Sequence, residues 1–161
     1  MPAGVTYNCL ATATSSGSSS SVVFSSISQS YTDLILVLSG KMATVAYFDV
    51  QFNGDTGSNY AFVRMIGFGT TVYTDRYNNF SSWQPNLSET QGTCVITMNN
   101  YSNTTTYKSG IFRDSNASQG VESSIGLWKN TSAISTITIS NGGGSNIPAG
   151  TNFTLYGIAA A

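Results

Sequence analysis

The side chains that could carry acid–base chemistry are seven carboxylates, and they are scattered along the chain. They are Asp33, Asp49, Asp55, Asp75, Glu89, Asp114 and Glu122. No local acid pair of the kind that hydrolyses glycosidic bonds is visible, although folding could still bring two of them together. The 161 residues include no histidine, which removes the commonest general base and every Ser-His-Asp or Cys-His system. The sequence therefore predicts a protein that is not an enzyme.

The sequence also offers few residues that could bind a metal ion or a cofactor. Cys9 and Cys94 stand alone, without a CxxC motif or a histidine nearby, so a structural zinc site would lack ligands. Oxygen-bearing side chains gather in residues 53–59, where two interpretations are open. One is a calcium site, and the other is a hairpin whose Asn and Asp side chains bind their own backbone, which we favour. We expect no metal ion and no cofactor.

The two cysteines also bear on the compartment. They could form one disulfide in an oxidising environment, but a domain of this size can be stable on its core alone. The first residues, MPAGVTY, lack the basic and apolar regions of a secretory signal. We expect two free, buried thiols.

The charge composition excludes two classes of partner. Only 8% of the residues are charged, and six Lys and Arg against seven Asp and Glu give a net charge of −1. Such a balance builds neither a phosphate-neutralising surface nor a polybasic membrane patch. Nucleic acid and membrane are therefore not expected as partners.

Period-two alternation predicts strands almost throughout the chain. In residues 46–53 the side chains of Ala46, Phe48, Val50 and Phe52 point to one face and polar ones to the other. About eleven such segments are separated by turn sequences, and residues 78–91 form the longest loop. The pattern predicts a single all-β domain over residues 1–161, an antiparallel two-sheet β-sandwich of jelly-roll type.

Two features suggest a surface for self-association. Residues 34–38 (LILVL) are apolar on both faces, which fits either a strand covered by another subunit or one buried within the monomer. The two tryptophans are large aromatic side chains that could lie in the core or in a contact, and the one in the long loop is the better surface candidate. The candidate interface residues are Leu34, Leu36, Leu38, Trp83 and Trp128. From this apolar surface we predict a homo-oligomer, most simply a homotrimer.

Several segments together resemble a family of bacteriophage virion proteins, of the kind common in cyanophages. They are residues 22–27 (VVFSSI), 31–34 (YTDL), 52–60 (FNGDTGSNY), 126–128 (GLW) and 153–158 (FTLYGI). The resemblance covers nearly the whole chain and implies a jelly-roll sandwich that occurs on capsid decoration (cement) proteins and at the tips of tail fibres. It implies no catalytic residue.

Two functions follow from that resemblance. The first is a structural protein of the virion, made in the host cytoplasm, that binds the major capsid protein on the outside of the assembled capsid. The alternative is the glycan-recognising tip of a tail fibre. A fibre tip needs a shaft, and the chain enters its first strand by about residue 5, so the sequence favours capsid decoration. With so few charges, we expect binding that high salt weakens little.

Overall fold

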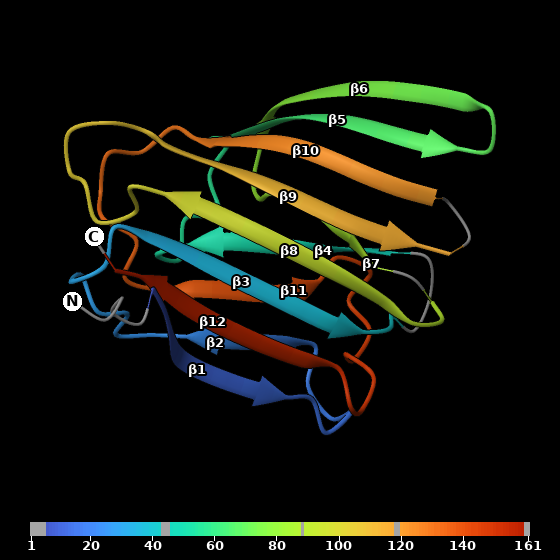
Figure 1. Cartoon of the computed structure of the whole chain (residues 1–161), viewed down its shortest axis with the longest axis horizontal. Helices are drawn as coiled ribbons and strands as arrows, with labels where there is room; N and C mark the ends of the chain where they lie inside the picture. The colour runs from blue at the N-terminus through green and yellow to red at the C-terminus, as the bar shows by residue number, and fades with distance from the viewer. Residues whose placement is uncertain (1–5, 43–45, 88, 118–119, 160–161) are drawn as a thin grey trace.

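The computed structural model describes residues 6–42, 46–87, 89–117 and 120–159. These residues form twelve strands (Figure 1): β1 Tyr7–Thr14, β2 Ser21–Phe24, β3 Asp33–Gly40, β4 Ala46–Phe52, β5 Tyr60–Phe68, β6 Thr71–Phe80, β7 Asn86–Leu87, β8 Gly92–Asn99, β9 Lys108–Asn116, β10 Gly120–Trp128, β11 Ile137–Asn141 and β12 Asn152–Ile158. The described residues contain no α-helix, so none of them forms a helix that could cross a membrane.

The strands form two sheets that pack face to face. The large sheet has eight strands in the order β1-β12-β3-β8-β9-β10-β5-β6, and the small sheet has four in the order β2-β11-β4-β7. Every pairing is antiparallel, and the chain crosses repeatedly from one sheet to the other. In Figure 1 the large sheet lies in front of the small one, and β5 and β6 form one end of it. The predicted all-β antiparallel sandwich is confirmed.

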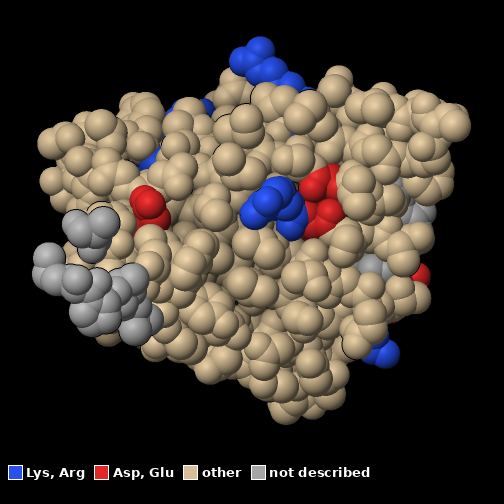
Figure 2. Space-filling model, in the orientation of Figure 1, with Lys and Arg blue, Asp and Glu red and all other residues tan. Residues whose placement is uncertain are grey.

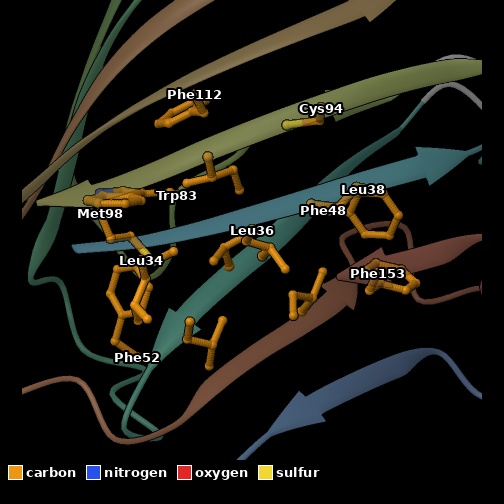
Figure 3. Close-up of a cluster of buried hydrophobic side chains, with 14 of the residues drawn as sticks. Leu34, Leu36, Leu38, Phe48, Phe52, Trp83, Cys94, Met98, Phe112 and Phe153 are labelled. Atoms are coloured by element: carbon orange, nitrogen blue, oxygen red, sulfur yellow. The ribbon is translucent and has the colours of Figure 1, made fainter. Parts of the chain in front are cut away.

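The core lies between the sheets and is rich in aromatic rings (Figure 3). Phe52 from the small sheet meets the ring of Trp83 edge-on at a centroid separation of 4.9 Å, and Phe48 meets Phe153 in the same way at 5.7 Å. Edge-to-face contacts of this kind add to the free energy gained by burial. The core therefore fixes the spacing of the two sheets.

Two glycines of the large sheet make room for the indole of Trp83. Gly126 of β10 and Gly110 of β9 are paired across the strands, and the ring lies against both. A Cβ atom added at Gly126 would lie only 2.5 Å from the Trp83 ring, and one at Gly110 would lie 2.9 Å from it. Because any larger residue would collide with the indole, the flat glycine pair explains how a loop tryptophan becomes a core residue.

The structure corrects two predicted boundaries. Alternation predicts a strand only over residues 126–129, but β10 begins at Gly120, because its polar inward positions interrupt the apolar alternation before that. The predicted loop at residues 78–91 also contains β7, which pairs with β4 along the edge of the small sheet. That segment covers the core and is part of the sandwich.

The candidate interface residues are also corrected. Leu34, Leu36, Leu38, Trp83 and Trp128 all have exposed fractions of 0%. The three leucines point inward from β3, where Leu36 lies opposite Leu155 of β12 and Ile96 of β8. None of the five offers surface to a partner of the folded chain, so they form the core, as the alternative interpretation of residues 34–38 had it.

Candidate binding face

The outer face of the large sheet, which points away from the small sheet, is unusually apolar. The outward positions of β5, β6, β9 and β10 include seven exposed apolar side chains. They are Val63, Met65, Val72, Ile111, Val121, Ile125 and Leu127, and their exposed fractions run from 37% to 71%. Aliphatic side chains exposed singly are normal, but a contiguous group of this size marks a contact surface.

Cross-strand pairing places the middle of this group in one row. Ile111 of β9 lies directly opposite Ile125 of β10, which lies opposite Val63 of β5. The row continues on both sides, and from β12 to β6 its members in order are Tyr156, Ile35, Thr97, Ile111, Ile125, Val63 and Arg76. With strands about 4.8 Å apart, it spans roughly 29 Å. We call this row the aliphatic stripe.

A second row runs beside the stripe and is more mixed. It places Val95 opposite Arg113, Arg113 opposite Ser123, and Ser123 opposite Met65. The outer face is hollowed there, over a mostly apolar depression whose lining includes Met65, Val72, Val95, Val121 and Arg113. The stripe and this depression together form one shallow apolar surface.

Among the described residues of this surface the cations point outward, whereas Asp114 and Glu122, which also line the depression, are each only 6% exposed. Arg76 of β6 and Arg113 of β9 are exposed, and neither makes an ion pair or a side-chain hydrogen bond with another described residue. Lys129, just beyond β10, is half-buried and donates a hydrogen bond from Nζ to Oδ1 of Asn79. Figure 2 views this side of the molecule and shows that charged residues cover only small parts of it.

The inner face of the same strands carries a buried acidic cluster. Asp114 of β9 and Glu122 of β10 lie directly opposite each other, each 6% exposed. Asn86 of β7 binds both: its backbone N donates to Asp114 Oδ2 at 3.1 Å, and its Nδ2 donates to Glu122 Oε2 at 2.8 Å. Ser124 Oγ donates to Glu122 Oε1 at 3.0 Å. The cluster thereby ties β7 to the large sheet.

Arg64 lies near this cluster but forms its ion pair with another carboxylate, Asp75. Arg64 Nη2 donates to Asp75 Oδ2 at 2.9 Å and to the Tyr77 hydroxyl at 2.6 Å. Its guanidinium also lies over the Tyr77 ring, 5.0 Å from the centroid. Arg64 acts on Asp114 and Glu122 through its electric field, without a hydrogen bond to either carboxyl in the described structure.

Burial dominates the electrostatics of the acid pair. Removal from water, and then the charge of Glu122, raise the pKa of Asp114 to about 8. Burial also raises the pKa of Glu122, against the opposing effects of Asn86 and Arg64. At neutral pH the pair therefore holds a proton, and both carboxyl groups are enclosed by protein rather than open to a substrate.

The oxygen-rich segment 53–59 is a turn in which Asp55 binds the turn's own backbone, as favoured from the sequence. It is not a hairpin, because it connects β4 of the small sheet to β5 of the large sheet, and these two strands do not pair. Asp55 accepts hydrogen bonds from Trp128 Nε1 at 2.8 Å, from the backbone N of Gly57 and from Asn59 Nδ2. Burial raises the pKa of Asp55, but these hydrogen bonds outweigh it and lower the pKa below its ordinary value. The carboxylate is thus used to hold the turn against β10.

The two cysteines differ in their exposure to solvent. Cys94 of β8 is fully buried in the core, where burial raises the pKa of its thiol. Cys9 of β1 is exposed, so the expectation of two buried thiols is wrong for that residue. It lies opposite Tyr156 of β12, which places it on the outer face of the large sheet.

Sequence reasoning missed both the outer surface and the acid pair. Asp114 and Glu122 are eight positions apart and meet only because β9 and β10 form a hairpin, whose second strand was predicted too short. The alternation of residues 108–116, with polar Lys108, Asp114 and Asn116 inward, could have been read as a strand facing out. Side-chain period alone does not say which face is buried.

No model of a known protein family matches the chain, and no curated protein matches it. Among solved structures it is similar to the galectin LEC-6 of Caenorhabditis elegans, with 9% identity, a TM-score of 0.38 and coverage of 92% of this chain and 96% of that chain. It is also similar to alginate lyase Aly36B, with 12% identity, a TM-score of 0.32 and coverage of 80% and 68%. It is similar as well to a mutant of that lyase in complex with an alginate tetrasaccharide, with 10% identity, a TM-score of 0.31 and coverage of 81% of this chain and 72% of that chain. Likenesses this distant assign neither a ligand nor a reaction to the chain, whose own surfaces are the guide to what it binds.

Proposed function

We propose that this chain is a non-enzymatic structural protein that docks on another protein through the outer face of its large sheet. The observation that carries the proposal is the aliphatic stripe, in which Ile111, Ile125 and Val63 lie side by side and are 41%, 61% and 48% exposed. Exposure of these side chains to water is unfavourable, and a flat apolar partner would relieve it at about 25 cal/mol per Å² buried.

The partner we propose is the outside of an assembled phage capsid. The resemblance of the chain to phage virion modules motivates this choice, and the small number of charges suits a protein displayed in many copies. Its location would then be the virion surface, reached from the host cytoplasm. The proposed homotrimer no longer rests on Leu34, Leu36 and Leu38, and the unpaired backbones of the edge strands β1 and β6 offer it another contact.

The absence of enzymatic activity belongs to the same proposal. The acid pair formed by Asp114 and Glu122 is the strongest catalytic candidate among the described residues, but both carboxyl groups are buried and bound by Asn86. Glycan hydrolysis should therefore be undetectable, and a substitution of either acid that abolished a measured hydrolysis would overturn this part.

The test mixes purified protein with capsids that lack it and measures occupancy, beside adsorption to host cells. Val63→Ser should lower occupancy by about tenfold, since it removes a central aliphatic contact. Val23→Ser is the matched control, because Val23 is 55% exposed but lies on β2 of the small sheet. Adsorption to cells without capsid binding would favour the fibre-tip alternative, and equal loss from both variants would refute docking through the outer face.

A further inference from the structure

The aliphatic centre of the outer face lies between two guanidinium groups. Arg76 closes one end of the stripe beyond Val63, while Arg113 stands in the neighbouring row beyond Ser123. The two are three strands and one row apart, which corresponds to roughly 16 Å between their positions on the sheet. Ile125, Val63 and Met65 lie in the space between them.

Neither guanidinium is neutralised by the described part of the chain. The carboxylates on β6, β9 and β10, Asp75, Asp114 and Glu122, belong to the inner face of those strands, where Asp75 pairs with Arg64. On the outer side, Asp33 at the start of β3 accepts a hydrogen bond from the backbone N of Asn100 at 2.6 Å. On β6, β9 and β10 the acids therefore point inward, while Arg76 and Arg113 point outward.

We infer that the partner of this face is a folded protein surface that presents aliphatic side chains flanked by two carboxylates, one for each Arg. This inference rests on the proposed docking and specifies its chemistry. Apolar contact would exclude water from the centre, and each Arg would meet a carboxylate in the bidentate geometry that guanidinium groups favour. The cations would then set the register of the partner, while the stripe supplies contact area.

A second copy of the same face does not fit. Two such faces together would enclose four unpaired guanidinium groups, and burying a charge without a counter-charge is strongly unfavourable. An oppositely charged partner removes that penalty. The charge of this face therefore disfavours self-association through it, which leaves the sheet edges for any homo-oligomer.

The experiment uses two kinds of probe, so that the partner chemistry and the proposed location can fail separately. The chemical probe is agarose carrying six-carbon chains that end in a carboxylate, compared with plain hexyl chains and with hexyl chains that end in an amine. The biological probe is the capsid preparation that lacks the protein. The variants are Arg76→Gln and Arg113→Gln, and the matched control is Lys41→Gln, since Lys41 is an exposed cation outside the outer face.

Each Arg substitution should weaken binding to the carboxylate resin and to capsids about fivefold, and Lys41→Gln should change it less than twofold. The native protein should be retained more by the carboxylate resin than by the plain hexyl resin, and least by the amine resin. Arg-dependent retention on the carboxylate resin without capsid binding would support the partner chemistry and refute the capsid location.

Capsid binding that Val63→Ser lowers but neither Arg substitution changes would keep the docking face and overturn the carboxylate-bearing partner. Equal retention on carboxylate and plain hexyl resin would overturn it too. So would light scattering that shows a dimer which Val63→Ser dissociates, because that result would make a second copy the occupant of the face.

Discussion

Strands β9 and β10 carry aliphatic side chains on the face toward water and carboxyl groups on the face toward the protein interior. Ile125 and Val121 of β10 are 61% and 65% exposed, while Glu122 between them is 6% exposed. A solvated antiparallel sheet ordinarily has the opposite arrangement. The difference indicates that folding and binding use different faces of the same strands. The inner face is held by aromatic packing and by the two hydrogen bonds that Asn86 donates to Asp114 and Glu122, which we call the Asn86 clamp. The outer aliphatic side chains contribute little to the stability of the fold.

Truncating a large side chain of the inner face should have the largest effect on the free energy of unfolding. Trp83→Ala empties the space between Phe52 and the Gly110–Gly126 pair, so it should lower the free energy of unfolding by about 3–5 kcal/mol. Ile125→Ala on the outer face should lower it by less than about 0.5 kcal/mol. Urea denaturation measures both values, and comparable losses would remove the distinction between the faces.

The acid pair should give the inner face an unusual pH dependence. The pKa of Asp114 is raised to about 8 in the folded protein, whereas an unfolded Asp titrates near 4. Between these values folded Asp114 holds more proton than unfolded Asp114, so the contribution of this group to stability is greatest below about pH 4 and falls as the pH rises to about 8, by up to about 1.4 kcal/mol per unit.

The variant Asp114→Asn should flatten this slope, since the amide oxygen can still accept from the Asn86 backbone N. Glu89→Gln serves as the control because Glu89 is exposed and outside the cluster. The measurement is urea denaturation of each protein between pH 4 and 9. Stability that rises over this range, or a slope that Asp114→Asn leaves unchanged, would show that the carboxyl pair is not protonated in the folded state.

Removing the Asn86 clamp should have an intermediate effect on the free energy of unfolding. Asn86→Ala removes the amide donor to Glu122 and leaves that buried carboxyl short of a partner, which should cost about 1–3 kcal/mol. Hydrogen exchange should then show faster opening of β7 and of the Val50–Trp83 bridge, while the β9–β10 pairing keeps its protection. Uniform loss of protection across both sheets would mean that Asn86 supports the whole fold and not β7 alone.

Much of the fold could be predicted from alternation, because residues such as Phe48, Val50 and Phe52 share one buried face. The site could not. Trp83 sits in a polar loop, and its burial depends on glycines that are far away in the sequence, Gly110 and Gly126. A strand with small or polar inward residues and aliphatic outward ones gives a period of two in either orientation, so only the tertiary pairing shows which face meets water.

The smallest effect on stability should come from the outer face itself. Replacing Val63, Ile111 and Ile125 together by Thr keeps β-branched side chains on the strands, so the free energy of unfolding should change by less than about 1 kcal/mol. Retention on a hydrophobic-interaction column at high sulfate should nevertheless fall clearly, because the three side chains are adjacent and exposed. The equivalent single change Val23→Thr on the small sheet should alter retention little, since it interrupts no row of aliphatic neighbours. If the triple variant instead unfolds at much lower urea, the stripe contributes to the fold, and its exposure would no longer call for a partner.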